Sequence, residues 1–212
     1  MDIFEAMETR RSVRRFAPGP VPRETVLKLV EMAITAPSAC DHQAWKFILV
    51  DDSQLLTKLT REGAASFLAQ APLAIIVLYP RITDNVEYQD GIQSAAAAIE
   101  NLLLAARALG LGACWICHLP PKRTLRRLLK IPWTYDPVAA VAVGYSEGAP
   151  RARPRKRKAE EVISSNEFRF SDVEHTVGPA MLTRRLARRL YYLCPFRRFL
   201  RPLASRFEKK FD

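Results

Sequence analysis

Four arginines and one serine crowd into six positions near the N-terminus, in the run Arg-Arg-Ser-Val-Arg-Arg. Arginine presents a planar fork of N–H donors that fits a phosphate or a ring carbonyl bidentately, so the run predicts an anion-binding segment. The alternative is a solvated basic turn. In an extended segment, side chains two apart face the same side, which groups Arg10, Ser12 and Arg14. Arg11 and Arg15 would then point away.

A second polar segment, residues 36–47, reads Ala-Pro-Ser-Ala-Cys-Asp-His-Gln-Ala-Trp-Lys-Phe. Pro37 ends the helical pattern before it, and the residues that follow form a polar loop. Ser38 does not stand in a Gly-x-Ser-x-Gly elbow, which argues against a hydrolase. His42 is the best candidate for a contact to substrate.

The third segment joins an Ala-rich helical pattern to Gly-Leu-Gly-Ala-Cys-Trp-Ile-Cys, and it poses the question of a redox or metal site. A zinc site would need a second pair of ligands beside Cys114 and Cys117, and the sequence has none. On a strand, side chains three apart point to opposite faces, so the two sulfurs would not meet. The Gly-x-Gly lacks the third glycine of a dinucleotide fingerprint. The histidines lack metal spacing, so no metal site is expected.

Composition narrows the class of protein. The 212 residues carry a formal net charge of +11. Residues 181–212 hold ten Lys/Arg and two Asp/Glu, so their net charge is +8. Residues 1–180 hold 23 Lys/Arg and 20 Asp/Glu, so their net charge is only +3. The nearly neutral body argues against nucleic acid as a partner. Four cysteines, no signal-peptide pattern and no long apolar run favour a cytoplasmic location.

Hydrophobic periodicity predicts a layered α+β domain around one sheet. The apolar runs predict strands over 45–50, 73–79, 112–119 and 138–143. Helical spacing predicts helices over 2–9, 23–35, 88–109 and 121–129, the third of them in the core. The predicted division is a domain over 1–170 and a basic, amphipathic helical extension over 171–212. Residues 178–212 either pack on the body or a partner subunit, or contact an anionic membrane surface.

In their order and spacing, the three segments together resemble the nitroreductase-like family of FMN-dependent oxidoreductases, over about residues 3–165. The resemblance implies a central mixed or antiparallel sheet flanked by helices, in a homodimer with two FMN sites at the subunit interface. It also implies a ping-pong reaction, in which NADH or NADPH gives hydride and a nitroaromatic, quinone or similar acceptor is reduced. The flavin would carry the chemistry, so no acid–base residue is assigned.

The resemblance also assigns cofactor contacts. One subunit would supply the arginine run, with Arg10 near the phosphate of FMN and Arg14 near the pyrimidine edge of its ring. The other subunit would supply the polar loop. The full set of expected FMN contacts is Arg10, Arg11, Ser12, Arg14, Pro37, Ser38, Ala39, Gln43, Arg155 and Arg157. The alternative for the last two is a solvated linker.

Departures from the family pattern keep other functions open. Cys40-Asp41 and Ala44 stand where the family often has Gly-Asn or Ser-Asn and a proline. Asp41 therefore puts an acid where a neutral amide is expected. One alternative is a divergent flavin-fragmenting, dehalogenating or dehydrogenating enzyme. The other is a non-enzymatic protein that binds flavin or a membrane surface.

Overall fold

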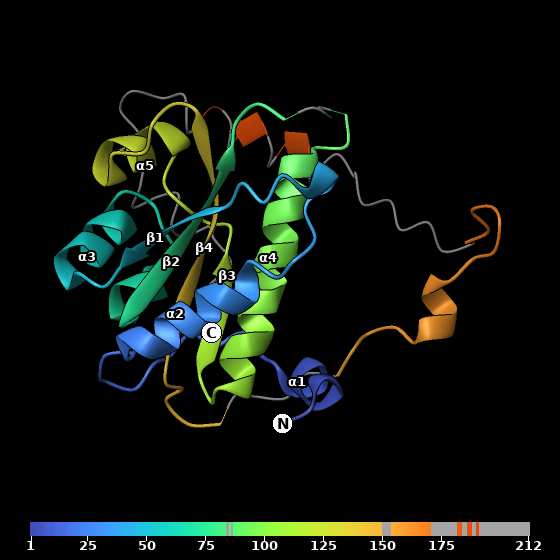
Figure 1. The fold of residues 1–212 in the computed structure, drawn as a ribbon, viewed down its shortest axis with the longest axis horizontal. Helices are drawn as coiled ribbons and strands as arrows, with labels where there is room; N and C mark the ends of the chain where they lie inside the picture. The colour runs from blue at the N-terminus through green and yellow to red at the C-terminus, as the bar shows by residue number, and fades with distance from the viewer. Residues whose placement is uncertain are drawn as a thin grey trace. The chain divides into compact units, whose positions relative to one another are not determined.

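An antiparallel sheet of four strands, in the order β1-β2-β4-β3, forms the centre of the fold in this computed structural model (Figure 1). The strands are β1 (Lys46–Val50), β2 (Leu73–Pro80), β3 (Gly112–Ile116) and β4 (Tyr135–Gly144). All of β2 but its last residue is buried, as expected for a strand with a continuous apolar sequence that is covered on both faces.

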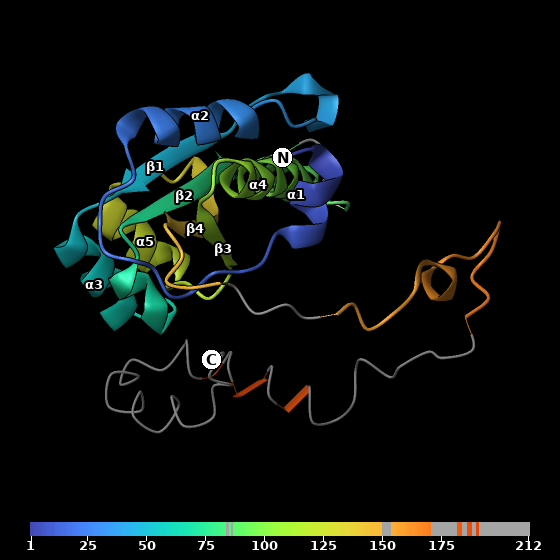
Figure 2. The ribbon, with the colours of Figure 1, turned by 90° about the horizontal axis from the view of Figure 1, so that it is seen from below.

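Helices cover both faces of the sheet (Figures 1 and 2). One face packs against α2 (Arg23–Ala33) and α4 (Asp90–Ala108). The other packs against α3 (Ser53–Arg61), the short 3-10 helix η2 (Ser66–Gln70) and α5 (Lys122–Leu129). The remaining elements are α1 (Ile3–Thr9), η1 (Ala39–Asp41) and η3 (Ala159–Val162). The predicted α+β fold, with helices flanking an antiparallel sheet, is confirmed.

The structure describes residues 1–83, 85, 87–149 and 154–170, and the single positions 182, 183, 186, 187 and 190. The chain forms two compact units, residues 1–153 and 154–212. The second contains η3 and an edge-to-face pair of Phe168 and Phe170 with ring centres 4.9 Å apart. The predicted C-terminal helices lie outside the described residues apart from those five positions, which are helical. Among the described residues, none of the helices has the length and apolar character needed to cross a membrane.

α4 is the core helix that the sequence predicts. Its residues Ala95, Ala98, Ile99 and Leu102 are fully buried. The alanines bring the helix close to the sheet, because a methyl group adds little between two backbones. α4 contacts α1, α2 and η1 as well as three strands, so the segments that carry the candidate site all lie against it.

Several element boundaries differ from the prediction by one to three residues. β3 ends at Ile116, three residues before the expected end of its strand. β4 begins at Tyr135, three residues before the expected start. Pro137 pairs with Leu78 at a point where the register shifts after Val77. A bulge of this kind accommodates the missing N–H of proline. α2 ends at Ala33, two residues early, because the next residues form turns before Pro37.

The arginine run lies against the outer edge of β3, and a glycine allows it to come this close. A Cβ atom placed on Gly112 would lie 2.8 Å from the Cβ and both Cγ atoms of Val13. Val13 is only 6% exposed, so it cannot move out of the way without losing its packing.

We expect Gly112→Ala to destabilise the protein by about 1–3 kcal/mol, because the added methyl group overpacks this contact. Urea denaturation measures the change in free energy of unfolding. Val13→Ala removes both Cγ atoms, so the double variant should lose less than the sum of the two single losses. A Gly112→Ala protein as stable as the parent would show that the arginine run does not pack here.

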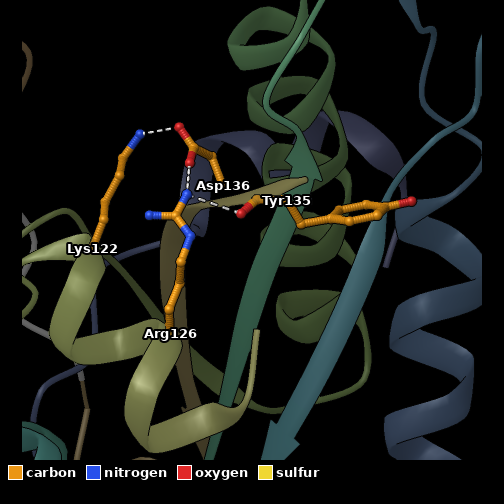
Figure 3. Close-up of polar contacts among 4 residues, drawn as sticks. All are labelled: Lys122, Arg126, Tyr135 and Asp136. Carbon is orange, nitrogen blue, oxygen red and sulfur yellow. Dashed lines mark hydrogen bonds and ion pairs between the residues drawn. The ribbon is translucent and has the colours of Figure 1, made fainter. Parts of the chain in front are cut away.

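A second stabilising contact fixes α5 to the start of β4 (Figure 3). Lys122 and Arg126 both donate to the carboxylate of Asp136, and Arg126 Nη2 also donates to the carbonyl of Tyr135 at 3.1 Å. Burial by itself would raise the pKa of Asp136, but the two cations outweigh it and the pKa is lowered. The ionised carboxylate therefore favours the folded state.

We expect Asp136→Asn to lower the free energy of unfolding by about 1–2 kcal/mol at neutral pH, because charge-assisted bonds are lost. A depressed folded pKa gives stability above the unfolded pKa of about 4, and this stability is lost on acidification. The difference between variant and parent should therefore shrink below that pH. Urea denaturation at neutral and acidic pH measures it. Asp51→Asn is the control, since Asp51 is exposed and forms no ion pair among residues that the structure describes; an equal effect there would contradict the expectation.

Candidate functional site

The arginine run extends the sheet beyond β3. Ser12 forms a parallel bridge with Ala113, and Val13 N–H donates to the Ala113 carbonyl at 3.0 Å. Farther along, Phe16 forms an antiparallel bridge with Ser146. The segment is therefore extended, as the alternating pattern of its side chains requires.

Arg10, Ser12 and Arg14 all act on one group, the thiol of Cys114. Cys114 is 2% exposed, and burial raises its pKa, while Arg14, Ser12 and Arg10 act in the opposite direction. Burial dominates, so the thiol is neutral at physiological pH. Two guanidiniums and a hydroxyl therefore gather at the edge of β3, a donor set that suits a phosphate or another anion.

The two arginines are held by different partners. Arg10 Nε lies 3.4 Å from a carboxylate oxygen of Glu100 on α4. The Arg14 guanidinium lies 5.9 Å from the centre of the Phe67 ring in η2, within the range of a cation–π contact. Both contacts restrain the position of the guanidinium.

The other two arginines point elsewhere. Arg11 Nη1 donates to the carbonyls of Glu8 and Arg10, at 2.6 and 2.8 Å. Arg15 is exposed and forms an ion pair with Glu147 at 3.1 Å. The geometry thus separates the arginines by alternation, with Arg11 and Arg15 outside the cluster around Cys114. The predicted FMN contact of Arg11 stays a prediction.

The polar loop has an unusual backbone. Cys40, Asp41 and Gln43 adopt left-handed φ angles of 49°, 54° and 47°, a region that non-glycine residues seldom occupy. Side-chain bonds support this conformation, since Ser38 Oγ accepts from the backbone N–H of Gln43 at 3.0 Å. Asp41 Oδ1 accepts from Gln43 Nε2 at 2.7 Å. Such conformations often mark functional sites.

The loop is attached to the first turns of α4 through Ser94. Ala39 N–H donates to Ser94 Oγ, and Trp45 Nε1 donates to the Ser94 carbonyl, both at 3.0 Å. His42 lies close enough to Asp90 to help lower the pKa of that carboxyl, although the hydrogen bond from Thr83 is the larger cause.

The two halves of the candidate site meet α4 at different places. The loop binds at Ser94 and Arg10 binds at Glu100, six residues later, which is about 9 Å along the axis and about one and two-thirds turns. Figure 1 shows the loop beside the N-terminal end of α4 and α1, which precedes the arginine run, beside its C-terminal end. Within one chain the two halves therefore lie on different sides of the helix.

Some expected site residues belong to the second unit. Arg155 and Arg157 are exposed there, and their role stays a prediction. The sequence did not predict that Ser94, Glu100 and Phe67 contact the candidate site. A polar side chain in an apolar helix was a signal for the first two, but the helix alone does not reveal which neighbour each one binds.

Contrary to the prediction of a strand over 112–119, the cysteine pair does not lie on one strand. Cys114 lies on β3 facing the core, and Cys117 lies beyond the end of the strand and is exposed. Both are free thiols, as is Cys40. Among the residues that the structure describes, no cluster of His, Cys, Asp or Glu could hold a metal ion.

Comparison with known proteins identifies the family. The model of the Nitroreductase family matches residues 7–62 and 55–145. A protein of Methanothermobacter thermautotrophicus, named provisionally as an NADH dehydrogenase/NAD(P)H nitroreductase, is 35% identical over 72% of this chain and 82% of its own length. The 5,6-dimethylbenzimidazole synthase of Rhodospirillum rubrum is 32% identical over 64% of this chain and 78% of its own.

A solved structure supports the same family through its fold. The FMN-dependent nitroreductase of Clostridium difficile R20291 superposes with a TM-score of 0.68 and 29% identity, over 78% of this chain and 99% of its own. The resemblance seen in the three sequence segments is thereby confirmed, and the chain belongs to the nitroreductase family of oxidoreductases.

Proposed function

We propose that the protein is an FMN-dependent oxidoreductase that takes hydride from NADH or NADPH and reduces nitroaromatic, quinone or similar acceptors. Donor and acceptor use one pocket in turn, as in a ping-pong mechanism. The observation that carries the proposal is the extended arginine run at the edge of β3, where Ser12 bridges to Ala113 and Glu100 holds Arg10. The names of the similar proteins support the choice of cofactor and co-substrate.

The residues at this edge fit the chemistry of FMN. Arg10, kept in place by Glu100, is suited to the phosphate, with Ser12 as a further donor. Arg14 is suited to the pyrimidine edge of the ring, where a fixed cation stabilises the negative charge that develops on reduction. We propose that Arg155 and Arg157 add to the phosphate site. When bound, FMN supplies the hydride chemistry, and the protein supplies position and charge.

We propose further that the protein is a homodimer and that the loop of one subunit completes the site of the other. Pro37, Ser38, Ala39 and Gln43 would reach the flavin from the partner. The separation of the two halves around α4 supports this arrangement. Apolar side chains on α1 are also exposed without cover in one chain, with Phe4 at 74%.

Asp41 supports a second candidate, a divergent member that uses the same flavin for another reaction. Its carboxylate is bonded to Gln43 in a loop where the family pattern has a neutral amide. The similarity to a 5,6-dimethylbenzimidazole synthase adds weight to this alternative. The remaining alternative is a protein that binds flavin but catalyses no reaction.

The experiment that separates these functions is reduction and reoxidation of the purified protein. We expect a yellow protein that releases FMN on denaturation, is bleached by NADH or NADPH, and is reoxidised by a quinone or nitro compound with the flavin intact. Loss of the flavin itself during turnover would favour the second candidate. A bound flavin that NAD(P)H leaves oxidised would refute the reductase, and a colourless protein that cannot be reconstituted would refute flavin binding.

We expect Arg10→Gln to weaken FMN affinity about 10- to 100-fold, the value of one or two lost charge-assisted bonds. Riboflavin lacks the phosphate, so its affinity should hardly change. Fluorescence titration of the apoprotein with both flavins measures the difference. Arg15→Gln is the matched control, because Arg15 pairs with Glu147 away from the cluster. An equal loss for both flavins, or for both variants, would show that Arg10 does not bind the phosphate.

A further inference from the structure

We propose that the outer face of α5 and the two apolar side chains beside it bind the surface of a membrane that contains anionic phospholipids. We call this surface the α5 patch and define it as Arg123, Arg127, Lys130, Ile82 and Trp133. The proposal does not depend on the function proposed above, because none of these residues belongs to the flavin site.

Charge is the first argument. Residues 122–136 hold five Lys/Arg and one Asp/Glu, a local net charge of +4. The single acid, Asp136, is occupied by Lys122 and Arg126 (Figure 3). This side of α5 is thereby fixed against β4, and its charge is partly neutralised.

The three cations of the α5 patch do not bind Asp136. Arg123 and Arg127 are four residues apart, so they lie on one face of α5. Lys130 follows directly after the helix, as its C-cap in a left-handed conformation. All three are exposed, and their side chains form no hydrogen bond or ion pair within the described part of the chain. Leu125 is 1% exposed on the inward side, which keeps the cations facing solvent.

Two apolar side chains near the C-terminal end of α5 are exposed. Trp133 is 65% exposed and Ile82 is 78% exposed. The antiparallel pairing of β2 and β4 continues past Pro80, where Arg81 N–H donates to the Thr134 carbonyl at 2.8 Å. Ile82 directly follows Arg81, and Trp133 directly precedes Thr134 in the turn before β4. Both residues are therefore next in the chain to this last bond at one end of the sheet, and Trp133 is three residues after Lys130.

Tryptophan beside cations suits the headgroup region of a bilayer. The indole ring favours the boundary between water and acyl chains, and basic residues are attracted to anionic headgroups. An exposed isoleucine gains free energy from acyl chains but nothing from a nucleic acid, so a bilayer is the better partner. Residues 181–212 carry a further net charge of +8. Stable attachment to a membrane generally takes two separate binding features, and this basic segment would be the second.

The test uses the full chain and vesicles of phosphatidylcholine with phosphatidylglycerol, whose acyl chains are brominated to quench tryptophan. Trp45 is only 6% exposed and Trp115 is partly buried, so Trp133 is the residue that should be quenched. Trp133→Phe should abolish the quenching. Pure phosphatidylcholine vesicles should bind weakly, and added salt should release the protein from the anionic ones.

Sedimentation with the same vesicles tests the cations. Replacing Arg123, Arg127 and Lys130 by Gln should weaken partitioning about 100-fold at low salt. The matched control replaces Arg23, Lys28 and Arg61 by Gln, removing three exposed charges outside α5, and should weaken it no more than a few-fold.

Four results would overturn the proposal. The first is that anionic vesicles do not bind the protein. The second is that they bind it and leave Trp133 unquenched, which would mean that residues 181–212 act alone. Equal losses in the two triple variants would show that only net charge matters. Binding to RNA that the α5 variant loses, without quenching by vesicles, would assign the patch to nucleic acid.

Discussion

The burial of α4 against the sheet is the constraint on which the rest of the structure depends. Its alanines bring the helix close to β2, β3 and β4, and its few polar residues then have fixed positions. Ser94 holds the strained loop, and Glu100 holds Arg10. A shift or rotation of α4 would move both halves of the candidate site at once. The site therefore depends on core packing as much as on its own hydrogen bonds.

Electrostatics in this protein are local. The charge of each important group is balanced by one or two partners: Arg10 by Glu100, Arg15 by Glu147, and Asp136 by two cations of α5. Residues 1–180 hold nearly equal numbers of acidic and basic residues, and positive charge gathers only at particular places. The edge of β3 and the outer face of α5 are two such places, and the physical difference between them is burial. The first surrounds a buried thiol, and the second faces solvent beside exposed apolar groups.

Much of the fold could be predicted because the signals are local. Continuous apolar runs gave β2 and most of β4, and helical spacing gave α4, since burial of a face requires that spacing in any helix. The errors fell where a distant neighbour decides the outcome. Pro137 lies in β4 next to a bulge at Val138, where the pairing with β2 shifts by one residue. Only part of the candidate site was predicted. The alternation of the arginines followed from the geometry of an extended segment, but the contacts of Glu100 with Arg10 and of Ser94 with the loop did not.

The sequence by itself determined the class of fold, the family resemblance and the grouping of Arg10, Ser12 and Arg14, because each depends on the order and spacing of neighbouring residues. Only the tertiary structure decided which partner each of these side chains meets. It showed that Gly112 lets the arginine run approach β3, and that the loop and the arginines attach to different sides of α4. Such contacts join residues far apart in the chain, and their distances follow from packing, which no local pattern encodes.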